Sequence, residues 1–309
     1  MSAAVETTPA PASRTPRWWR TRRGEQRLVG YAFLLPDLLG LAVFVALPIL
    51  GAFYISFHDW TGIGAREWTG TANYETLLQD QAFRDSLKIT AVYTVTFVPL
   101  LFVLSLALAL LVNRGLALSG FFRSAYFAPF MVSLVVASVV WGFMLQDPGG
   151  VLNAILGLFG IEPQPWLGST RLAMVSVILV TLWQGVGYSM IIFLTGLQDI
   201  PKVYYEAAVV DGAGAWRRFR GITLPLLRPT SVFVLLITFI SALQLFDPIY
   251  VLTQGGPAGA TRTTVVYIYE TAFQFLQLGY ASALSVALFV IILVFSLLQL
   301  RIFRHESYD

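Results

Sequence analysis

Residues 196–229 read GLQDIPKVYYEAAVVDGAGAWRRFRGITLPLLRP, and an apolar stretch of membrane-spanning length lies on each side. No helix breaker occurs from Lys202 to Val210, and Gly212 follows shortly after. Pro201 is tolerated at the start of a helix because its missing N–H would be unpaired there in any case. The stretch therefore predicts a short helix, too short to span a bilayer. A second, basic helical stretch is expected from Trp216 to Phe219.

The composition around this stretch is that of a membrane protein. The chain has 309 residues, of which 57% are hydrophobic and only 12% charged, whereas soluble domains are about one quarter charged. Membrane lipid is thus the expected partner of its surface. The formal charge of +3 gives nucleic-acid binding no support. The absence of cysteine excludes disulfides and thiolate chemistry, and no ligand cluster predicts a metal or a cofactor.

Six stretches are long and apolar enough to cross the membrane, which takes about 20 residues for about 30 Å of hydrocarbon. They are residues 30–56, 88–112, 124–145, 172–197, 223–246 and 281–302. Asp37 is the only ionised residue well inside one of them, as expected when a central charge costs about 3 kcal/mol. Prolines within the spans predict kinks. The sequence predicts an all-α, polytopic membrane protein with six transmembrane helices.

Basic residues decide the orientation of these helices. An even number of spans places both termini on one side, and 15 of the 20 Lys and Arg residues fall on that side. The positive-inside rule therefore predicts cytoplasmic termini in the inner membrane. The expected organisation is a disordered basic tail over 1–28, a transmembrane domain over 29–303 and a short cytoplasmic tail over 304–309.

The loop between the fourth and fifth spans carries a recognisable signature. Glu206-Ala207-Ala208 is followed by Gly212, Ile222 and Leu224-Pro225. This spacing resembles the loop of binding-protein-dependent ABC importer permeases, a family with a type I importer transmembrane domain. Shorter stretches resemble its carbohydrate branch, the maltose and glycerol-phosphate type. They are residues 121–123, 183–188, 197–201, 246–247, 255–257 and 278–283.

This resemblance implies a coupling helix inside a loop over residues 198–221. The helix would sit in a cleft of a cytoplasmic ATPase dimer, with Glu206 paired to a basic residue there and Gly212 supplying the tight turn. The implied coupling residues are Glu206, Ala207, Ala208, Asp211, Gly212 and Ala213. A second, non-identical permease and an extracytoplasmic solute-binding protein are the other implied partners. Neither lysine follows a glycine, so the chain has no phosphate-binding loop. ATP hydrolysis is therefore expected in a separate subunit, and this chain is expected to be non-catalytic.

The same resemblance implies a solute path between the fourth and fifth spans. In maltose-type permeases the matching positions line the cavity, and here they are Gln184, Gly185, Tyr188, Thr238, Ser241, Ala242 and Leu245. The last four are spaced to share one helical face. No basic residue is evident well inside the spans, which favours a neutral solute over an anion.

Other interpretations stay open at this point. The short helix could be an interfacial connector, and the span-five hydroxyls could simply bridge neighbouring helices. A permease for glycerol phosphate or a polyol would have the same signature. An ion-driven secondary transporter would be expected to carry ionisable residues near the bilayer midplane, which these spans lack, and transport without ATP would reveal it. The two histidines, His58 and His305, suggest no enzyme site.

Overall fold

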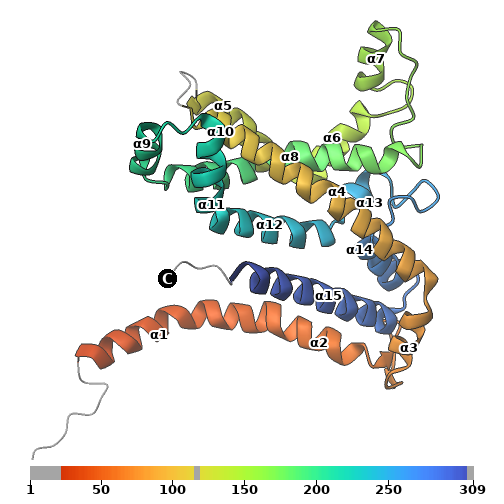
Figure 1. The fold of residues 1–309 in the computed structure, drawn as a ribbon. Coiled ribbons are helices and arrows are strands. Elements are labelled where there is room, and N and C mark those ends of the chain that lie inside the picture. The colour runs from red at the N-terminus through yellow and green to blue at the C-terminus, as the bar shows by residue number, and fades with distance from the viewer. Residues whose placement is uncertain (1–21, 115–118, 305–309) are drawn as a thin grey trace, which may run out of the picture. The chain divides into compact units, whose positions relative to one another are not determined.

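The computed structural model describes residues 22–114 and 119–304. The chain divides into two compact units, residues 1–54 and 55–309, and the helices are drawn in Figure 1. Most of the predicted N-terminal tail and the residues after Arg304 lie outside the described part. Arg22–Gly24 and the next few residues, which sequence analysis assigned to that tail, already belong to the first helix.

The first unit is one continuous helical span. It consists of α1 (Arg22–Leu41), a π-turn η2 (Ala42–Ala46) and α2 (Leu47–Ile55). The Leu47 N–H bonds to the Ala42 carbonyl, five residues back. The widened turn lies just before Pro48, which has no N–H to donate. Residues 29–55 form an apolar span, and no residue of its most apolar window is buried within the chain.

The second unit contains the remaining elements. A two-residue antiparallel pair, β1 (His58–Asp59) with β2 (Glu67–Trp68), precedes α3 (Ala72–Gln79). The helices that follow are α4 (Gln81–Val112), α5 (Ser119–Phe127), η3 (Ala128–Met131), α6 (Leu134–Met144), α7 (Val151–Leu158), α8 (Leu172–Gln198), α9 (Lys202–Val210), α10 (Ala215–Arg218), η4 (Phe219–Thr223), α11 (Leu224–Leu226), α12 (Arg228–Leu243), α13 (Asp247–Leu252), α14 (Thr264–Tyr269), η5 (Glu270–Gln274) and α15 (Leu278–Arg304).

Three long helices, α4, α8 and α12, build the core of this unit. Figure 1 shows α4 and α8 side by side, with α9 and α10 near one end of the pair and α3 and α14 near the other. Tyr93 of α4 and Val177 of α8 are fully buried between them. A second cluster around Phe193 and Leu227 lies toward α9, and a third joins α3, α14 and α15. The part of α8 around residues 184–188 is therefore held in place by packing against several neighbouring helices.

The third predicted span is not one helix. Sequence analysis placed a span over 124–145 and expected its proline to kink it, and the chain bends there by 95° between Met131 and Leu134. Pro129, which has no backbone donor, lies in the 3₁₀ turn η3, and Val132 directly after this turn is extended. Among the described residues, five helices are long and apolar enough to span a membrane, and this bent pair makes up to six.

Candidate functional site

A cavity of about 410 Å³ lies between α4, α8 and α12, with the break in the third span closing one side. None of the residues that line it is charged, and together they present aromatic rings, hydroxyl groups and aliphatic groups. They are Tyr93, Phe97, Leu101, Phe130, Leu134, Thr181, Gln184, Gly185, Tyr188, Ser189, Ile237, Thr238, Ser241 and Leu245. The cavity thus opens within the part of the chain that spans the membrane.

Six of the seven residues expected on a solute path line this one cavity. Gln184, Gly185 and Tyr188 enter it from α8, and Thr238, Ser241 and Leu245 enter it from α12 and its C-terminal end. The seventh, Ala242, does not: it is 1% exposed and belongs to the hydrophobic core. The residues are brought together as predicted, although their contact with a solute remains a prediction.

Sequence reasoning missed the wall contributed by α4. Tyr93, Phe97 and Leu101 are spaced by four, so they form one stripe along that helix. This period was visible in the sequence, but nothing local indicated that the stripe faces residues almost 90 positions away. Tyr93 shows the connection, since its hydroxyl donates to Thr181 Oγ1 of α8 at 3.0 Å.

The break in the third span supplies the opposite wall. The Phe130 ring stacks on the Tyr188 ring at 4.4 Å between centroids and 13° between planes. Gln184 Nε2 donates to the Val132 carbonyl at 3.0 Å. Nearby, Gly187 lets α8 approach the Tyr126 carbonyl so closely that an added Cβ would overlap it. The break therefore contacts α8, which supplies a hydrogen bond to one of its carbonyls, as non-helical backbone at membrane depth requires.

These groups define what the cavity can bind. The hydroxyls of Tyr188, Ser241 and Thr238 and the Gln184 amide can donate and accept hydrogen bonds. Aromatic rings offer apolar faces for stacking. No ionised side chain lines the cavity, and burying an unpaired charge is costly. The arrangement suits an uncharged molecule with several hydroxyl groups. Within the described residues, no three His, Asp or Glu side chains gather as a metal site would need.

The second feature is α9, which matches the predicted short helix residue for residue. None of its side chains is buried. Glu206 and Ala207 are exposed, and Ala208 and Ala213 are half-buried. Val210, at its end, is 88% exposed. A helix that leaves both small and apolar side chains uncovered outside the spans offers a contact surface to another protein.

The end of α9 is closed by a glycine turn. Gly212 has a φ of +73°, a left-handed conformation that only glycine adopts at low cost. The Ala213 N–H donates to the Ala208 carbonyl at 2.8 Å, and the Gly212 N–H to the Val209 carbonyl at 3.0 Å. This is a Schellman motif. Asp211 is exposed beside it. The tight turn expected at Gly212 is present.

One tyrosine connects α9 to the rest of the unit. Tyr205 packs against the cluster around Phe193, and its hydroxyl lies 2.9 Å from Thr223 Oγ1. A groove of about 420 Å³ runs beside it, lined by Lys202, Tyr205, Glu206, Val209 and Arg218. Through Tyr205, a force on α9 would reach the segment that leads into α12 and hence the cavity.

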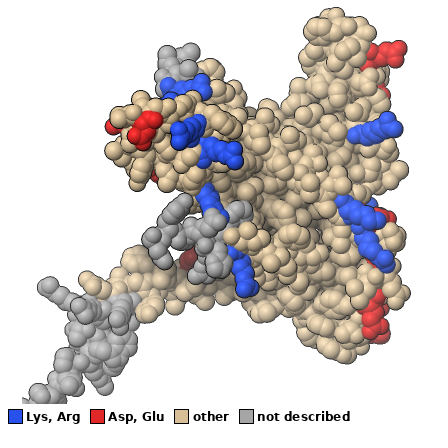
Figure 2. Space-filling model, viewed as in Figure 1, with Lys and Arg blue, Asp and Glu red and all other residues tan. Residues whose placement is uncertain are grey.

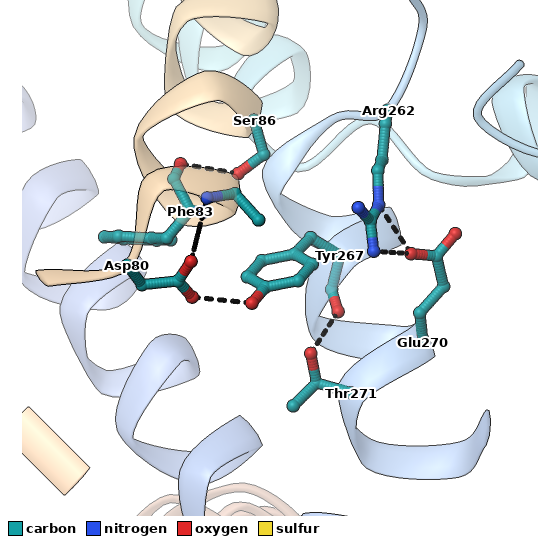
Figure 3. Close-up of polar contacts among 8 residues, drawn as sticks. Asp80, Phe83, Ser86, Arg262, Tyr267, Glu270 and Thr271 are labelled. Atoms are coloured by element: carbon teal, nitrogen blue, oxygen red, sulfur yellow. Dashed lines mark hydrogen bonds and ion pairs between the residues drawn. The ribbon is translucent and has the colours of Figure 1, made fainter. Parts of the chain in front are cut away.

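A polar cluster at the other end of α4 was not predicted (Figure 3). Asp80 Oδ2 accepts hydrogen bonds from Tyr267 at 2.5 Å and from Tyr280 at 2.6 Å. Arg262 forms an ion pair with Glu270 and lies over the Tyr267 ring. Burial opposes ionisation of Asp80, but the hydrogen bonds from Tyr267, Tyr280, Phe83 and Ala82 outweigh it and lower the pKa of the carboxyl. Burial, helped by the Asp80 carboxylate, raises the pKa of Tyr267 to about 12.

Comparison with known proteins gives a family match. A family model described as "Binding-protein-dependent transport system inner membrane component" matches residues 102–307. The chain is 36% identical over 277 residues to the trehalose/maltose transport system permease protein MalF of Thermococcus litoralis, covering 89% of this chain and 94% of that one. It is also 36% identical over 276 residues to the lactose transport system permease protein LacF of Rhizobium radiobacter, covering 87% and 92%.

Solved structures show the same fold. The chain matches one in the crystal structure of a bacterial alginate ABC transporter in complex with alginate pentasaccharide-bound periplasmic protein. The TM-score is 0.81, the identity is 24%, and the match covers 93% of this chain and 97% of that chain. At this identity the likeness concerns the arrangement of the helices.

Proposed function

The chain belongs to the family of binding-protein-dependent transport system inner membrane components, and we propose that it forms half of the membrane pathway of an ATP-driven sugar importer. The expected all-α importer fold and the resemblance to this family are confirmed. The chain is a multi-pass membrane protein. Relatives are named as permeases for trehalose/maltose, lactose and arabinooligosaccharides, which supports a carbohydrate as cargo.

The cavity supports a neutral cargo. It is lined by Gln184, Tyr188 and Ser241 and contains no charged side chain. A polyol would satisfy the same groups, whereas glycerol phosphate would bring a charge that no lining residue neutralises. A sugar or a related uncharged polyhydroxy compound is therefore the favoured cargo.

The exposed helix α9 is the single observation that carries the coupling role. It lies outside the spans, none of its residues is buried, and Tyr205 connects it to the chain leading into α12. We propose that it docks in a cytoplasmic ATPase subunit, with Glu206, Ala207, Ala208, Asp211, Gly212 and Ala213 at the contact. Closure of an ATPase dimer would move this helix and reshape the cavity.

The remaining partners follow from the family. A second permease subunit would complete the pathway, and an extracytoplasmic binding protein would deliver the solute. Exposed apolar side chains of the first span, such as Phe33 and Phe44, could contact such a subunit or lipid. Both termini and α9 would face the cytoplasm. Hydrolysis of ATP would occur in the ATPase subunits, and this chain would be non-catalytic.

Reversing the charge at Glu206 tests the coupling role. The importer is reconstituted in vesicles with its ATPase and binding protein. In Glu206→Lys its ATP-driven uptake should fall at least about tenfold, because an exposed acid that faces a basic partner is replaced by a like charge. The measurement is uptake of labelled sugar together with ATP hydrolysis. Glu162→Lys, an exposed acid outside α9, is the matched control and should transport normally.

Two outcomes would contradict the proposal. Normal uptake by Glu206→Lys would remove α9 from the coupling contact. Uptake that needs only an ion gradient, with no ATP on the cytoplasmic side, would make the chain a secondary transporter instead.

A further inference from the structure

A second large cavity lies where α4 and α8 end beside α9 and α10. Its volume is about 600 Å³. Asn113 and Arg114 enter it from the end of α4, Trp216 and Arg218 from α10, and Tyr205 from α9. It is separate from the central cavity, with which it shares no lining residue.

The charged side chains that line this cavity are all basic. Arg114 and Arg218 line it together with the Asn113 amide, and no acidic side chain does. Figure 2 shows basic side chains gathered over this end, around α10, with acidic ones farther out on α9. Two guanidinium groups and an amide present only favourable donors to an anion, and arginine forks match phosphate oxygens in particular.

Arg218 carries a donor that the chain itself does not satisfy. Its Nε is buried and has no hydrogen-bond partner among the described residues. Buried donors are nearly always paired, and leaving one unpaired is unfavourable. Arg218 also borders the groove that contains Glu206, yet no ion pair between these two described residues is formed. An acceptor from outside the chain would complete this site.

The rest of the cavity is apolar and lies at the depth of a membrane surface. Leu110 and Leu197, from the last turns of two spanning helices, line it together with Phe219. Trp216 is 71% exposed at its rim, and tryptophan is enriched where headgroups meet water. A free anion would use the arginines and leave these apolar groups uncovered, whereas a lipid would cover both.

We propose that this cavity binds the phosphate headgroup of an anionic phospholipid, with Arg114 and Arg218 on the phosphate. Basic pockets between helices at the cytoplasmic leaflet recognise such headgroups. The inference rests on the membrane orientation proposed above, which places this end in the cytoplasmic leaflet. Because Tyr205 and Thr223 both line the cavity and contact each other, the lipid would stabilise the junction between α9 and the segment leading into α12.

Lipid titration of the full-length chain in detergent, followed by native mass spectrometry, tests this site. The probes are dioleoylphosphatidylglycerol, dioleoylphosphatidylcholine and inorganic phosphate. Arg218→Gln should weaken phosphatidylglycerol binding about tenfold, since a charge-assisted hydrogen bond is lost. It should weaken phosphatidylcholine binding much less, because the choline cation already opposes two arginines at the phosphate. Arg217→Gln and Arg220→Gln are matched controls, because both side chains are exposed and neither lines the cavity; they should bind like the parent.

Several results would overturn the proposal. Equal weakening in Arg217→Gln or Arg220→Gln would show a diffuse charge effect in place of a site. Displacement of the lipid by inorganic phosphate at equal concentration would make a soluble anion the ligand. Unchanged lipid binding in Arg218→Gln together with lost ATPase assembly would make an acidic partner residue the occupant.

A fallback variant keeps the test decisive. If Arg218→Gln fails to fold, Arg114→Gln, whose side chain is exposed, should give the same weakening, and parent-like binding would then refute the site. Lipid binding and sugar uptake are separate readouts. Normal ATP-driven uptake without lipid discrimination refutes this inference alone, whereas lipid binding without ATP-driven uptake refutes the proposed function.

Discussion

Asp80 joins three helices through one carboxylate. Its Oδ1 accepts the Ala82 and Phe83 N–H groups and so caps α4, as aspartate commonly does before a helix. Its Oδ2 accepts the hydroxyls of Tyr267 and Tyr280. The capping role is local and readable from sequence. The tyrosines lie 187 and 200 residues away, so only the folded chain could reveal them.

Acid should weaken this joint. Hydrogen bonds hold the folded pKa of Asp80 below its ordinary value of 3.8, so its stabilisation is complete at neutral pH and is lost as the pH falls below about 4. Thermal unfolding of the full chain in detergent from pH 7 to pH 3 measures this. Asp80→Asn should lower the Tm at pH 7 by roughly 3–6 °C and should reduce the further loss on acidification.

The control is another acid of the same helix. Asp85 is exposed and, within the described part of the chain, pairs with its neighbours Lys88 and Gln81, and exposed pairs contribute little. Asp85→Asn should therefore leave the Tm nearly unchanged at both pH values. If the two variants respond alike, the joint at Asp80 contributes nothing specific.

Gly212 is a position where backbone conformation decides the residue type. Its φ of +73° costs other residues about 1–2 kcal/mol, and β-branched ones most. Gly212→Val should fray the end of α9 and lower ATP-driven uptake severalfold at equal protein amounts. Gly214→Val is the matched control, since Gly214 has an ordinary φ of −66° and open space around it. Equal uptake by both variants would mean that the turn does not matter for coupling.

Among the elements, α9 and the third span show what sequence can and cannot predict. The bounds of α9 follow from local signals, Pro201 before it and Gly212 after it. The third span carried a local signal too, Pro129, which predicts a kink in general terms. Whether a proline bends or breaks a span depends on which other residues hydrogen-bond to the backbone groups that it frees. Here Gln184, from another helix, donates a hydrogen bond to the Val132 carbonyl. No local sequence pattern predicts this contact.

Removing the Gln184 amide should therefore loosen the break. Gln184→Leu leaves the Val132 carbonyl without this donor and should cost about 1 kcal/mol, seen as a lower Tm of the full chain in detergent and weaker uptake. Thr195→Val is the control on the same helix, because Thr195 is exposed and its hydroxyl donates to Ile191 of its own helix. A Tm drop in Thr195→Val as large as in Gln184→Leu would show that any polar loss on α8 has this effect.

For the whole molecule, the central cavity depends on long-range packing. Family resemblance located its walls on α8 and α12, but Tyr93 and Phe97 of α4 became part of it only because α4 packs along α8. Apolar stripes of this kind occur on every spanning helix, and in lipid they give no hint of which neighbour they face. Composition could predict the spans, while the partner of each helix face required the fold.

Orientation is the prediction on which the whole mechanism depends, because α9 can meet an ATPase only from the cytoplasm. The chain has no cysteine, so a single introduced thiol is the only one that can react. Ile63, between the two strands, is 85% exposed, and Val210 of α9 is 88% exposed. With most Lys and Arg on the α9 side, the positive-inside rule predicts that a membrane-impermeant maleimide labels Ile63→Cys in intact cells. Val210→Cys, expressed without the ATPase that would cover it, should be labelled only after permeabilisation. The parent chain gives the background, and labelling of Val210→Cys in intact cells would place α9 outside and end its assignment as the coupling helix.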